Sequence, residues 1–229
     1  MKKKKQGKLV VVDGTDGVGK ATQVRLTARR LRKLGYKVKT IDFPGYERNF
    51  FGKMIRRYLS GEFGNASEVD PHLVSTWYAN DRLEDTPRIN SWLNDGYIVI
   101  ADRYASSNAI HQGGKIKDKK KREGFLKWLD EMEFKTLKIP RPDAIIYLDM
   151  PIEFSTGLLK KNSAKKKKAH LKMEKDIHES DKQHLEDARG SAMDIVKRRN
   201  KWININCVEN EKLLSKAKIT EMILEKLNF

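Results

Sequence analysis

The residues best suited to do chemistry form a glycine-rich loop, GTDGVGK, at positions 14–20. It fits the G-x-x-x-x-G-K pattern and lies between an apolar run and an amphipathic stretch. Glycines let backbone N–H groups point at phosphate oxygens, a helix start adds positive partial charge, and Lys20 can reach the β- and γ-phosphates. The relaxed pattern also arises by chance, though rarely between a buried strand and a helix. We predict a nucleoside triphosphate site made by Gly14, Thr15, Asp16, Gly17, Val18, Gly19, Lys20, Ala21 and Thr22.

The residue after Lys20 departs from the usual form of this loop. It is Ala21, where most such loops have Ser or Thr, whose hydroxyl binds Mg²⁺. This argues against a GTPase-type or motor-type site, where that hydroxyl matters most. It matters less for nucleoside monophosphate kinases: adenylate kinases carry glycine there and then threonine, much as Thr22 follows here. We expect Mg²⁺ to be held by nucleotide phosphates, water and carboxylates such as Asp16 or Asp102.

Five apolar runs predict the strands that position this loop. Residues 9–12, 97–101 and 144–148 have the continuous apolar character of strands buried on both faces, and residues 38–43 and 202–206 indicate two more. Segments long enough for helices separate them. Strands that alternate with helices predict an α/β fold of the P-loop NTPase type, with a five-stranded parallel sheet and helices on both faces.

Helical patterns complete this arrangement. An apolar stripe follows the loop up to Gly35, residues 51–59 are helix-like, and residues 66–93 hold helical periodicity. Pro71 and Pro87 are expected to mark turns or helix starts. In such folds the ligand binds at the carboxyl ends of the strands, so the segments that follow strands should hold the site.

Six separated stretches have a recognisable order and spacing: DGTDGVGK at 13–20, FPG at 43–45, YANDR at 78–82, DRY at 102–104, SN at 107–108 and QG at 112–113. Together they resemble the thymidylate kinase family from about residue 9 to residue 149; the last third of the chain matches only loosely. The resemblance implies phosphoryl transfer from ATP to dTMP with Mg²⁺, and a homodimer.

Two residues after the strand at 97–101 suit the chemistry of this transfer, which is mainly positioning and charge neutralisation. Arg103 could bind the dTMP phosphate bidentately, or it could be a surface arginine paired with an acidic neighbour. Asp102 could polarise a metal-bound water, or it could cap the next helix. With Lys20 and Asp16 these form the predicted catalytic set, and Asp16 and Asp102 the predicted metal ligands.

The remaining roles follow from the resemblance. Asp16 would accept a hydrogen bond from the sugar 3′-hydroxyl and help hold the metal. Tyr78 would stack on thymine, unless it is a core residue, and Arg82 on the same helical face would donate to the base carbonyl. The predicted dTMP-binding residues are Asp16, Phe43, Pro44, Arg48, Tyr78, Arg82, Arg103, Ser107, Asn108, His111 and Gln112.

Three of these residues need comment. Asn108 and Gln112 are four apart, so one helical face could present both amides to the base edge. His111 stands where this family more often has an aromatic such as tyrosine, which crowds the ribose 2′ position. The alternative is a partly exposed helix histidine. Discrimination between deoxyribose and ribose is therefore an open question at the sequence level.

A lysine-rich segment is expected to form a mobile lid over about residues 158–180. Thymidylate kinases supply a catalytic arginine either from the phosphate loop or from this lid, but position 17 is glycine and residues 160–175 contain no arginine. A lysine could neutralise the transferring group, although it lacks the bidentate fork of arginine. The alternative is a solvated lysine run. Residues 176–179 could contribute hinge or metal contacts.

The whole chain of 229 residues is expected to form one domain, residues 1–229, with a formal charge of +17. That charge suits nucleotides, nucleic acid or anionic membranes, or it reflects solubilising lysines. A single cysteine and the lack of an apolar run long enough to span a bilayer favour a cytosolic protein. Two alternatives stay open: a kinase for another nucleotide or deoxynucleoside, and an inactive P-loop protein that binds nucleic acid. Against the second, no groove-reading motif is present.

Overall fold

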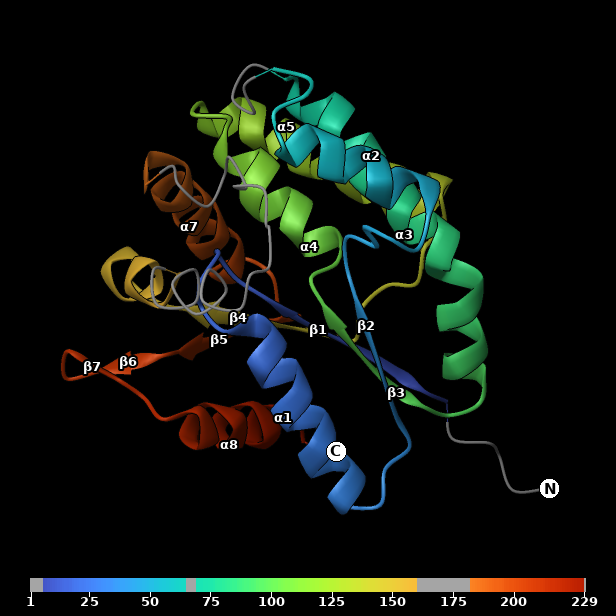
Figure 1. Ribbon diagram of the computed structural model, residues 1–229, viewed down its shortest axis with the longest axis vertical. Coiled ribbons are helices and arrows are strands. Elements are labelled where there is room, and N and C mark those ends of the chain that lie inside the picture. The colour runs from blue at the N-terminus through green and yellow to red at the C-terminus, as the bar shows by residue number, and fades with distance from the viewer. Residues whose placement is uncertain (1–5, 65–68, 160–181, 229) are drawn as a thin grey trace, which may run out of the picture.

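The computed structural model describes residues 6–64, 69–159 and 182–228. At its centre lies a five-stranded parallel sheet with strand order β2-β3-β1-β4-β5 (Figure 1). This confirms the predicted α/β architecture, and each strand overlaps its predicted apolar run. The strands are β1 (Lys8–Asp13), β2 (Val38–Asp42), β3 (Ile98–Asp102), β4 (Ala144–Asp149) and β5 (Trp202–Asn206).

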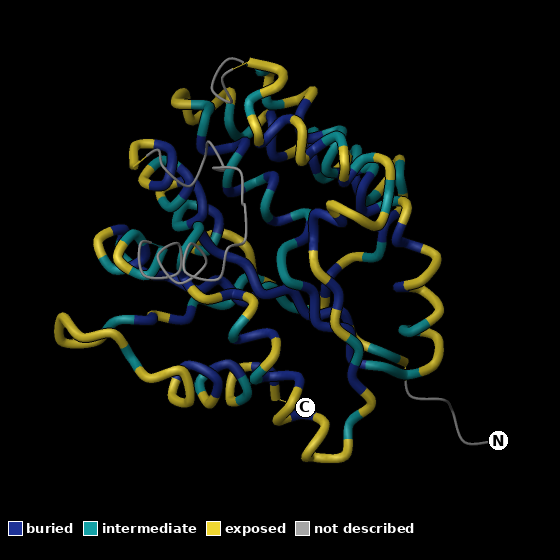
Figure 2. Tube along the Cα trace, in the orientation of Figure 1, coloured by how far each residue is buried: buried dark blue, intermediate teal, exposed yellow. Residues whose placement is uncertain are grey.

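Two hydrophobic cores lie on opposite faces of the sheet, and side chains alternate between them along β1. Val10 and Val12 enter one core, whereas Leu9 and Val11 enter the other. Because both faces are covered, residues 9–12 of the strand are all apolar and buried (Figure 2). The helices α1 (Lys20–Lys33) and α8 (Lys216–Leu227) cover the first face (Figure 1).

The second face carries helices that follow β2, β3 and β4 along the chain. These are α3 (Pro71–Asn94), the short α4 (Ala105–Ser107), α5 (Lys119–Asp130) and α7 (Lys182–Val196). Two π-helical segments, η1 (Asn108–Gln112) and η2 (Glu131–Thr136), continue α4 and α5. The helix α2 (Phe50–Leu59) packs on α3 through Ile55, Tyr58 and Val74. A small antiparallel hairpin, β6 (Val208–Glu209) and β7 (Lys212–Leu213), was not predicted.

The helix α3 differs in one respect from the sequence expectation. Pro71 does stand at its first turn, and Asp70 caps it by accepting from the backbone N–H groups of His72 and Leu73. Pro87, however, lies inside the helix rather than at a turn or a start. Its side chain faces solvent, where water can satisfy the carbonyl that loses its partner, while buried neighbours such as Thr86 and Ile89 hold the helix against the protein.

The sheet register brings three loop starts to one edge. In β1 and β3, Val12 pairs with Asp102; in β2 and β3, Asp42 pairs with Asp102. The chain leaves all three strands at the same level and in the same direction. The glycine-rich loop, the Pro44 loop and the Arg103 segment therefore meet at the carboxyl edge of the sheet.

Candidate active site

The glycine-rich loop connects β1 to α1 and leaves the start of that helix open. Gly17 and Gly19 have φ angles of 83° and 89°, a region that favours glycine. Gly19 caps α1 without a side-chain hydrogen bond, and the first turn contains no acidic residue. The backbone N–H groups of this turn are thus left to bind an anion.

Lys20 lies folded against the loop that precedes it. Its Nζ donates to the carbonyl oxygens of Gly14 at 3.1 Å and Thr15 at 2.8 Å, and it lies 3.7 Å from Oδ1 of Asp16. Burial lowers the pKa of Lys20, and the nearby charge of Arg103 lowers it further, although the neighbouring carboxylates oppose both effects. The ammonium group is held at the loop, where the phosphates of a nucleotide would lie.

Gly17 has no room for a side chain. A Cβ atom there would lie 2.4 Å from the carbonyl oxygen of Ser155 and 2.7 Å from Cγ of Leu159. Since its φ angle also disfavours L residues, an arginine at position 17 would need both the loop and the segment above it to move. The phosphate loop therefore has no arginine at position 17, and its backbone would not accommodate one without rearrangement.

Asp13 fastens the loop to the acceptor side of the site. Its buried carboxylate accepts hydrogen bonds from Ser106 Oγ at 2.5 Å, from Ser107 Oγ at 2.9 and 3.0 Å, and from the backbone N–H of Gly14 at 2.9 Å. Asp13 had no separate predicted role. Its position as the first polar residue after a buried strand was the available signal.

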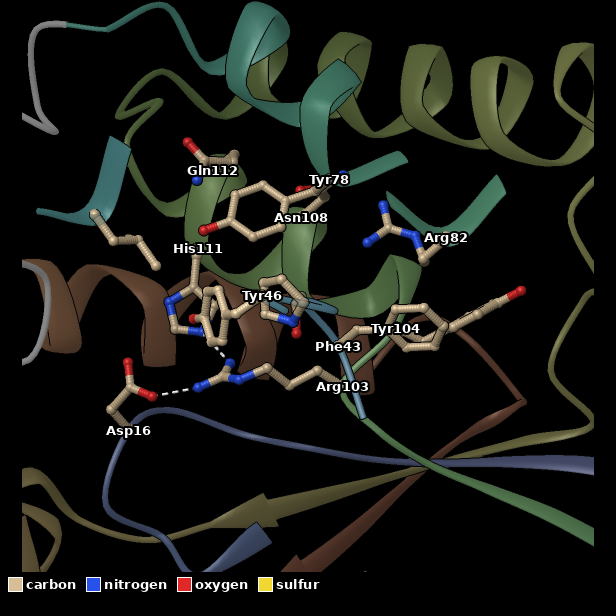
Figure 3. A pocket seen from close by; sticks show the side chains of 13 residues that line it. Asp16, Phe43, Tyr46, Tyr78, Arg82, Arg103, Tyr104, Asn108, His111 and Gln112 are labelled. Atoms are coloured by element: carbon tan, nitrogen blue, oxygen red, sulfur yellow. Dashed lines mark hydrogen bonds and ion pairs between the residues drawn. The ribbon is translucent and has the colours of Figure 1, made fainter. Parts of the chain in front are cut away.

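Arg103 lies between the phosphate loop and the helical segment that follows β3. Its φ angle is 64°, in the left-handed region, and its backbone N–H donates to the carbonyl of Val12 at 3.0 Å. The guanidinium donates to Oδ1 of Asp16, and its Nη1 lies 3.0 Å from Nε2 of His111 (Figure 3). Burial lowers the pKa of Arg103, but the carboxylates of Asp16, Asp13 and Asp102 together raise it above its ordinary value.

His111 is half-buried and lies near the cationic side chains of Arg103 and Lys20. Burial lowers the pKa of its imidazole well below 6.5, and Arg103 lowers it further. Its ring stacks on that of His184 from α7, with centroids 5.7 Å apart. Because Arg103 can only donate, the Nε2 atom that faces it accepts the hydrogen bond, and the imidazole is neutral with its proton on Nδ1.

A cavity opens beside Arg103 and gathers most of the predicted acceptor residues (Figure 3). Its enclosed free space is about 60 Å³, far below the roughly 300 Å³ of an ordinary ligand pocket. Tyr46, which is 37% exposed, stands over the guanidinium of Arg103 in Figure 3. A nucleotide could enter only if such a residue moved. The lining residues are Asp16, Phe43, Pro44, Tyr46, Leu59, Tyr78, Arg82, Arg103, Tyr104, Ser107, Asn108, His111 and Gln112.

Arg82 is fixed within this cavity by a buried ion pair. Its Nε and Nη2 donate to the two carboxylate oxygens of Glu133 at 2.8 and 2.7 Å, and both side chains are 1% exposed. Asn108 donates to the same carboxylate at 3.0 Å and to the carbonyl of Ser75 at 3.2 Å. Asn108 and Gln112 begin and end a π-helical turn rather than an α-helical one, and both are buried.

Of the predicted dTMP-binding residues, only Arg48 lies outside the cavity lining, and Asp102 of the predicted catalytic set lies outside it as well. Arg48 donates from Nη1 to Asp42 at 2.8 Å and from Nε to Asp85 at 3.2 Å, so it is held in the loop after β2. Asp102 lies at the end of β3 beneath the site. Burial raises its pKa, while the charges of Lys20 and Arg103 oppose that rise.

Among the residues that the structure describes, no group of three or more His, Cys, Asp or Glu side chains is arranged to hold a metal ion. Mg²⁺ in kinases usually takes one or two carboxylates together with phosphates and water, so a complete protein cage is not required. Asp16 lies in the phosphate loop, and Asp102 ends β3 beside the strand that leads into this loop. Both are hard oxygen donors, and both raise the pKa of Lys20. This donor set fits Mg²⁺ bound to a nucleotide.

The predicted lid lies mostly outside the described residues, which stop at residue 159 and resume at residue 182. The lysine run and residues 176–179 fall within that gap. In the described part of the chain, none of the helices is both long and apolar enough to cross a membrane.

A family model described as thymidylate kinase matches residues 12–219. The human thymidylate kinase is 30% identical over 150 residues, which cover 65% of this chain and 63% of the human one, less than two thirds of its length. A probable thymidylate kinase of Thermococcus onnurineus is 33% identical over 161 residues, covering 68% of this chain and 73% of that one.

A solved thymidylate kinase structure from Candida albicans has a similar fold. The TM-score is 0.69, and the similarity covers 97% of this chain and 92% of that one at 19% sequence identity. At this identity the likeness concerns the fold alone.

Proposed function

Since this chain belongs to the thymidylate kinase family, as the match over residues 12–219 shows, we propose that it transfers the γ-phosphoryl group of ATP to dTMP, giving ADP and dTDP. It is then a nucleoside monophosphate kinase. The observation that carries the proposal is the meeting, at one sheet edge, of an open phosphate loop and a cavity that contains Arg103. Phosphoryl transfer needs a donor and an acceptor held in line, and this edge offers a separate anion site for each.

On the donor side, residues 14–22 would hold ATP. The loop N–H groups and the start of α1 would bind its phosphates, and Lys20 would turn from the loop carbonyls toward the β- and γ-phosphates. When bound, Mg²⁺ neutralises charge on the transferring phosphoryl group, and Asp16 and Asp102 are the residues that we propose to hold it. Asp13 would hold the phosphate loop in a fixed position relative to the segment after β3, because it accepts hydrogen bonds from Ser106 and Ser107.

On the acceptor side, Arg103 would hold the dTMP phosphate. Its guanidinium already faces the phosphate loop through Asp16, so the acceptor phosphate would be placed beside the donor once Tyr46 moves aside and the phosphate replaces part of the contact with Asp16. Tyr78 would stack on the base, while Arg82, Asn108 and the buried Gln112 would meet its polar edge. His111, which lines the same cavity, would face the sugar and would bear on the choice between deoxyribose and ribose.

The test is a coupled assay of ADP release with dTMP, dUMP, dGMP, CMP and thymidine as acceptors. We expect dTMP to have the highest kcat/KM. Negligible turnover of dTMP beside strong turnover of another acceptor would contradict the proposal and favour a kinase for that nucleotide or nucleoside.

We also propose a homodimer, which the family resemblance implies, and a cytosolic location, which the single cysteine favours. Light scattering coupled to size-exclusion chromatography would measure the mass in solution. A mass near that of one 26.5 kDa chain at micromolar concentration would argue against the dimer.

A further inference from the structure

A second and larger cavity lies on the other side of Glu133 from the acceptor cavity. Its volume is about 440 Å³, within the range of small-molecule pockets. It lies among α5, η2, the last turn of α7 and the chain entering β4 and β5. Its apolar wall consists of Leu126, Leu129, Phe134, Ile145, Ile195 and Trp202. None of the roles assigned above to the transfer of phosphate uses this space.

The rim of the second cavity is cationic. Arg141, Arg198, Arg199 and Lys201 line it, against two carboxylates, those of Asp130 and Glu133. Both carboxylates are already neutralised, because Asp130 forms a double hydrogen bond with Arg141 at 2.8 Å and Glu133 is bonded to Arg82. The charges of Arg198, Arg199 and Lys201 therefore exceed the negative charge that remains on the rim.

Two of the cations are available to a ligand. Within the described ranges, neither Arg199 nor Lys201 takes part in an ion pair of 4 Å or less; Lys201 donates from Nζ to the carbonyl of Pro142 at 3.1 Å, and the charge of Arg199 acts on Asp130, whose carboxylate is bonded to Arg141. Arg141 is different, since it is held by Asp130 and lies 4.3 Å above the ring of Phe134. Guanidinium and ammonium groups over a wall of Trp and aliphatic side chains suit an anionic group attached to a flat apolar body.

Glu133 forms the partition between the two cavities. It lines the second cavity, yet its carboxylate accepts the hydrogen bonds of Arg82 and Asn108, which line the first. Ser106 makes a parallel connection: it also lines the second cavity, and its hydroxyl donates to Asp13 at 2.5 Å. A molecule that shifts η2 or α4 would therefore move groups that hold the acceptor cavity and the phosphate loop.

We propose that the second cavity is a binding site for an organic anion with an aromatic body, and that its occupancy is linked to the acceptor cavity through Glu133. The site itself does not depend on the proposed function. The linkage does, because it takes dTMP as the occupant of the first cavity.

The test of the site uses 8-anilinonaphthalene-1-sulfonate, an aromatic sulfonate whose fluorescence rises in apolar surroundings, with the full chain and saturating dTMP to fill the first cavity. Arg199→Glu combined with Lys201→Glu reverses the two available charges. The matched control, Arg29→Glu combined with Lys33→Glu, makes the same change on the exposed face of α1. We expect the first pair to weaken binding at least about tenfold and the control pair to change it less than about twofold.

Ile145→Phe adds bulk to the apolar wall and should weaken probe binding without changing any charge. Equal effects of the two charge-reversal pairs, or wild-type affinity in Ile145→Phe, would overturn the site. Thermal melts of each variant establish that it is folded, and both residues of the charge pair are exposed.

The linkage is tested by calorimetric titration of dTMP with and without the probe. Because linkage is reciprocal, each ligand must change the affinity of the other by the same factor, and we expect that factor to exceed about three. In the Arg199→Glu and Lys201→Glu variant it should fall to one; simple competition in the first cavity would leave it unchanged and would overturn the linkage. A chain that binds the probe but not dTMP would contradict the proposed function and leave the site standing.

Discussion

At the residue scale, Arg103 connects the two halves of the site. It reaches Asp16 of the phosphate loop and His111 of the acceptor cavity with one guanidinium, from a backbone with a φ angle of 64°. A non-glycine residue in this region is uncommon and is often kept where function requires it. Lysine has one point charge and cannot make both contacts in this fork-like geometry.

Arg103→Lys tests this geometry. The charge is retained, but one charge-assisted hydrogen bond is lost, which is worth about 1.5–3 kcal/mol. We expect kcat/KM for dTMP to fall by about 10- to 150-fold, measured by coupled assay at saturating ATP. Arg57→Lys, in an exposed pair with Glu62, is the control and should change kcat/KM less than about twofold. Full activity in Arg103→Lys would show that only the charge matters.

His111 predicts a pH dependence of stability. Burial holds its pKa well below 6.5 in the folded protein, so the unfolded chain binds a proton there at mildly acidic pH and the folded chain does not. The free energy of unfolding is therefore unaffected by this group above pH 6.5. It falls as the pH drops below 6.5, by up to about 1.4 kcal/mol per pH unit.

His111→Gln removes the titrating group and keeps an atom that can accept from Arg103. Urea unfolding at pH 7.5 and pH 5.5 gives the difference in stability between wild type and variant at each pH, so that other titrating groups cancel. We expect that difference to shift by about 1 kcal/mol in favour of the variant at pH 5.5. A constant difference would mean that His111 titrates alike in both states.

At the element scale, the strands were predictable and several helical details were not. Continuous apolar runs have one explanation in a chain of this kind, a strand buried on both faces, and β1 shows it by sending alternate residues into two cores. Pro87 reads locally as a break, yet packing on both sides of it keeps α3 continuous. The π-helical turn at Asn108–Gln112 likewise depends on what surrounds it and leaves no local pattern.

Some residues of the site were likewise predictable from the sequence, and others were not. The phosphate loop and Arg103 directly follow strands, so topology alone placed them at one edge. Glu133 could not be found in this way, because its partner Arg82 is 51 positions distant along the chain and lies on a different helix. Tyr46 was missed for a related reason: an aromatic in a loop gives no sign of which cavity it covers.

Glu133→Gln tests how far η2 depends on this pair. The amide keeps the size of the side chain but leaves the charge of Arg82 buried without compensation, which typically costs about 3–5 kcal/mol. We expect a loss of that order in urea unfolding. Glu131→Gln, two positions away and exposed, should stay within about 0.5 kcal/mol of wild type. Similar losses in both variants would mean that the pair does not hold η2 in place.

At the scale of the whole molecule, the sheet edge divides into a donor half and an acceptor half that share few residues. The loop between β1 and α1 belongs to the first half, and the segments after β2 and β3 belong to the second, with Asp16 and Asp13 between them. A formal charge of +17 draws anions to the protein but does not distinguish the halves. Ligand-induced stabilisation can distinguish them, because each ligand stabilises the folded chain only through its own half.

Thermal melts with a non-hydrolysable ATP analogue, with dTMP and with both should therefore separate in two variants. In the wild type, each ligand at about 100 times its Kd adds about 2.7 kcal/mol, or roughly 5–11 °C in Tm for a chain of this size. Lys20→Ala should lose most of the shift caused by the ATP analogue and keep that caused by dTMP; Arg103→Ala should do the reverse. Loss of both shifts in either variant would mean that the loop and the cavity form one inseparable site, since the charge of Arg103 also acts on Lys20.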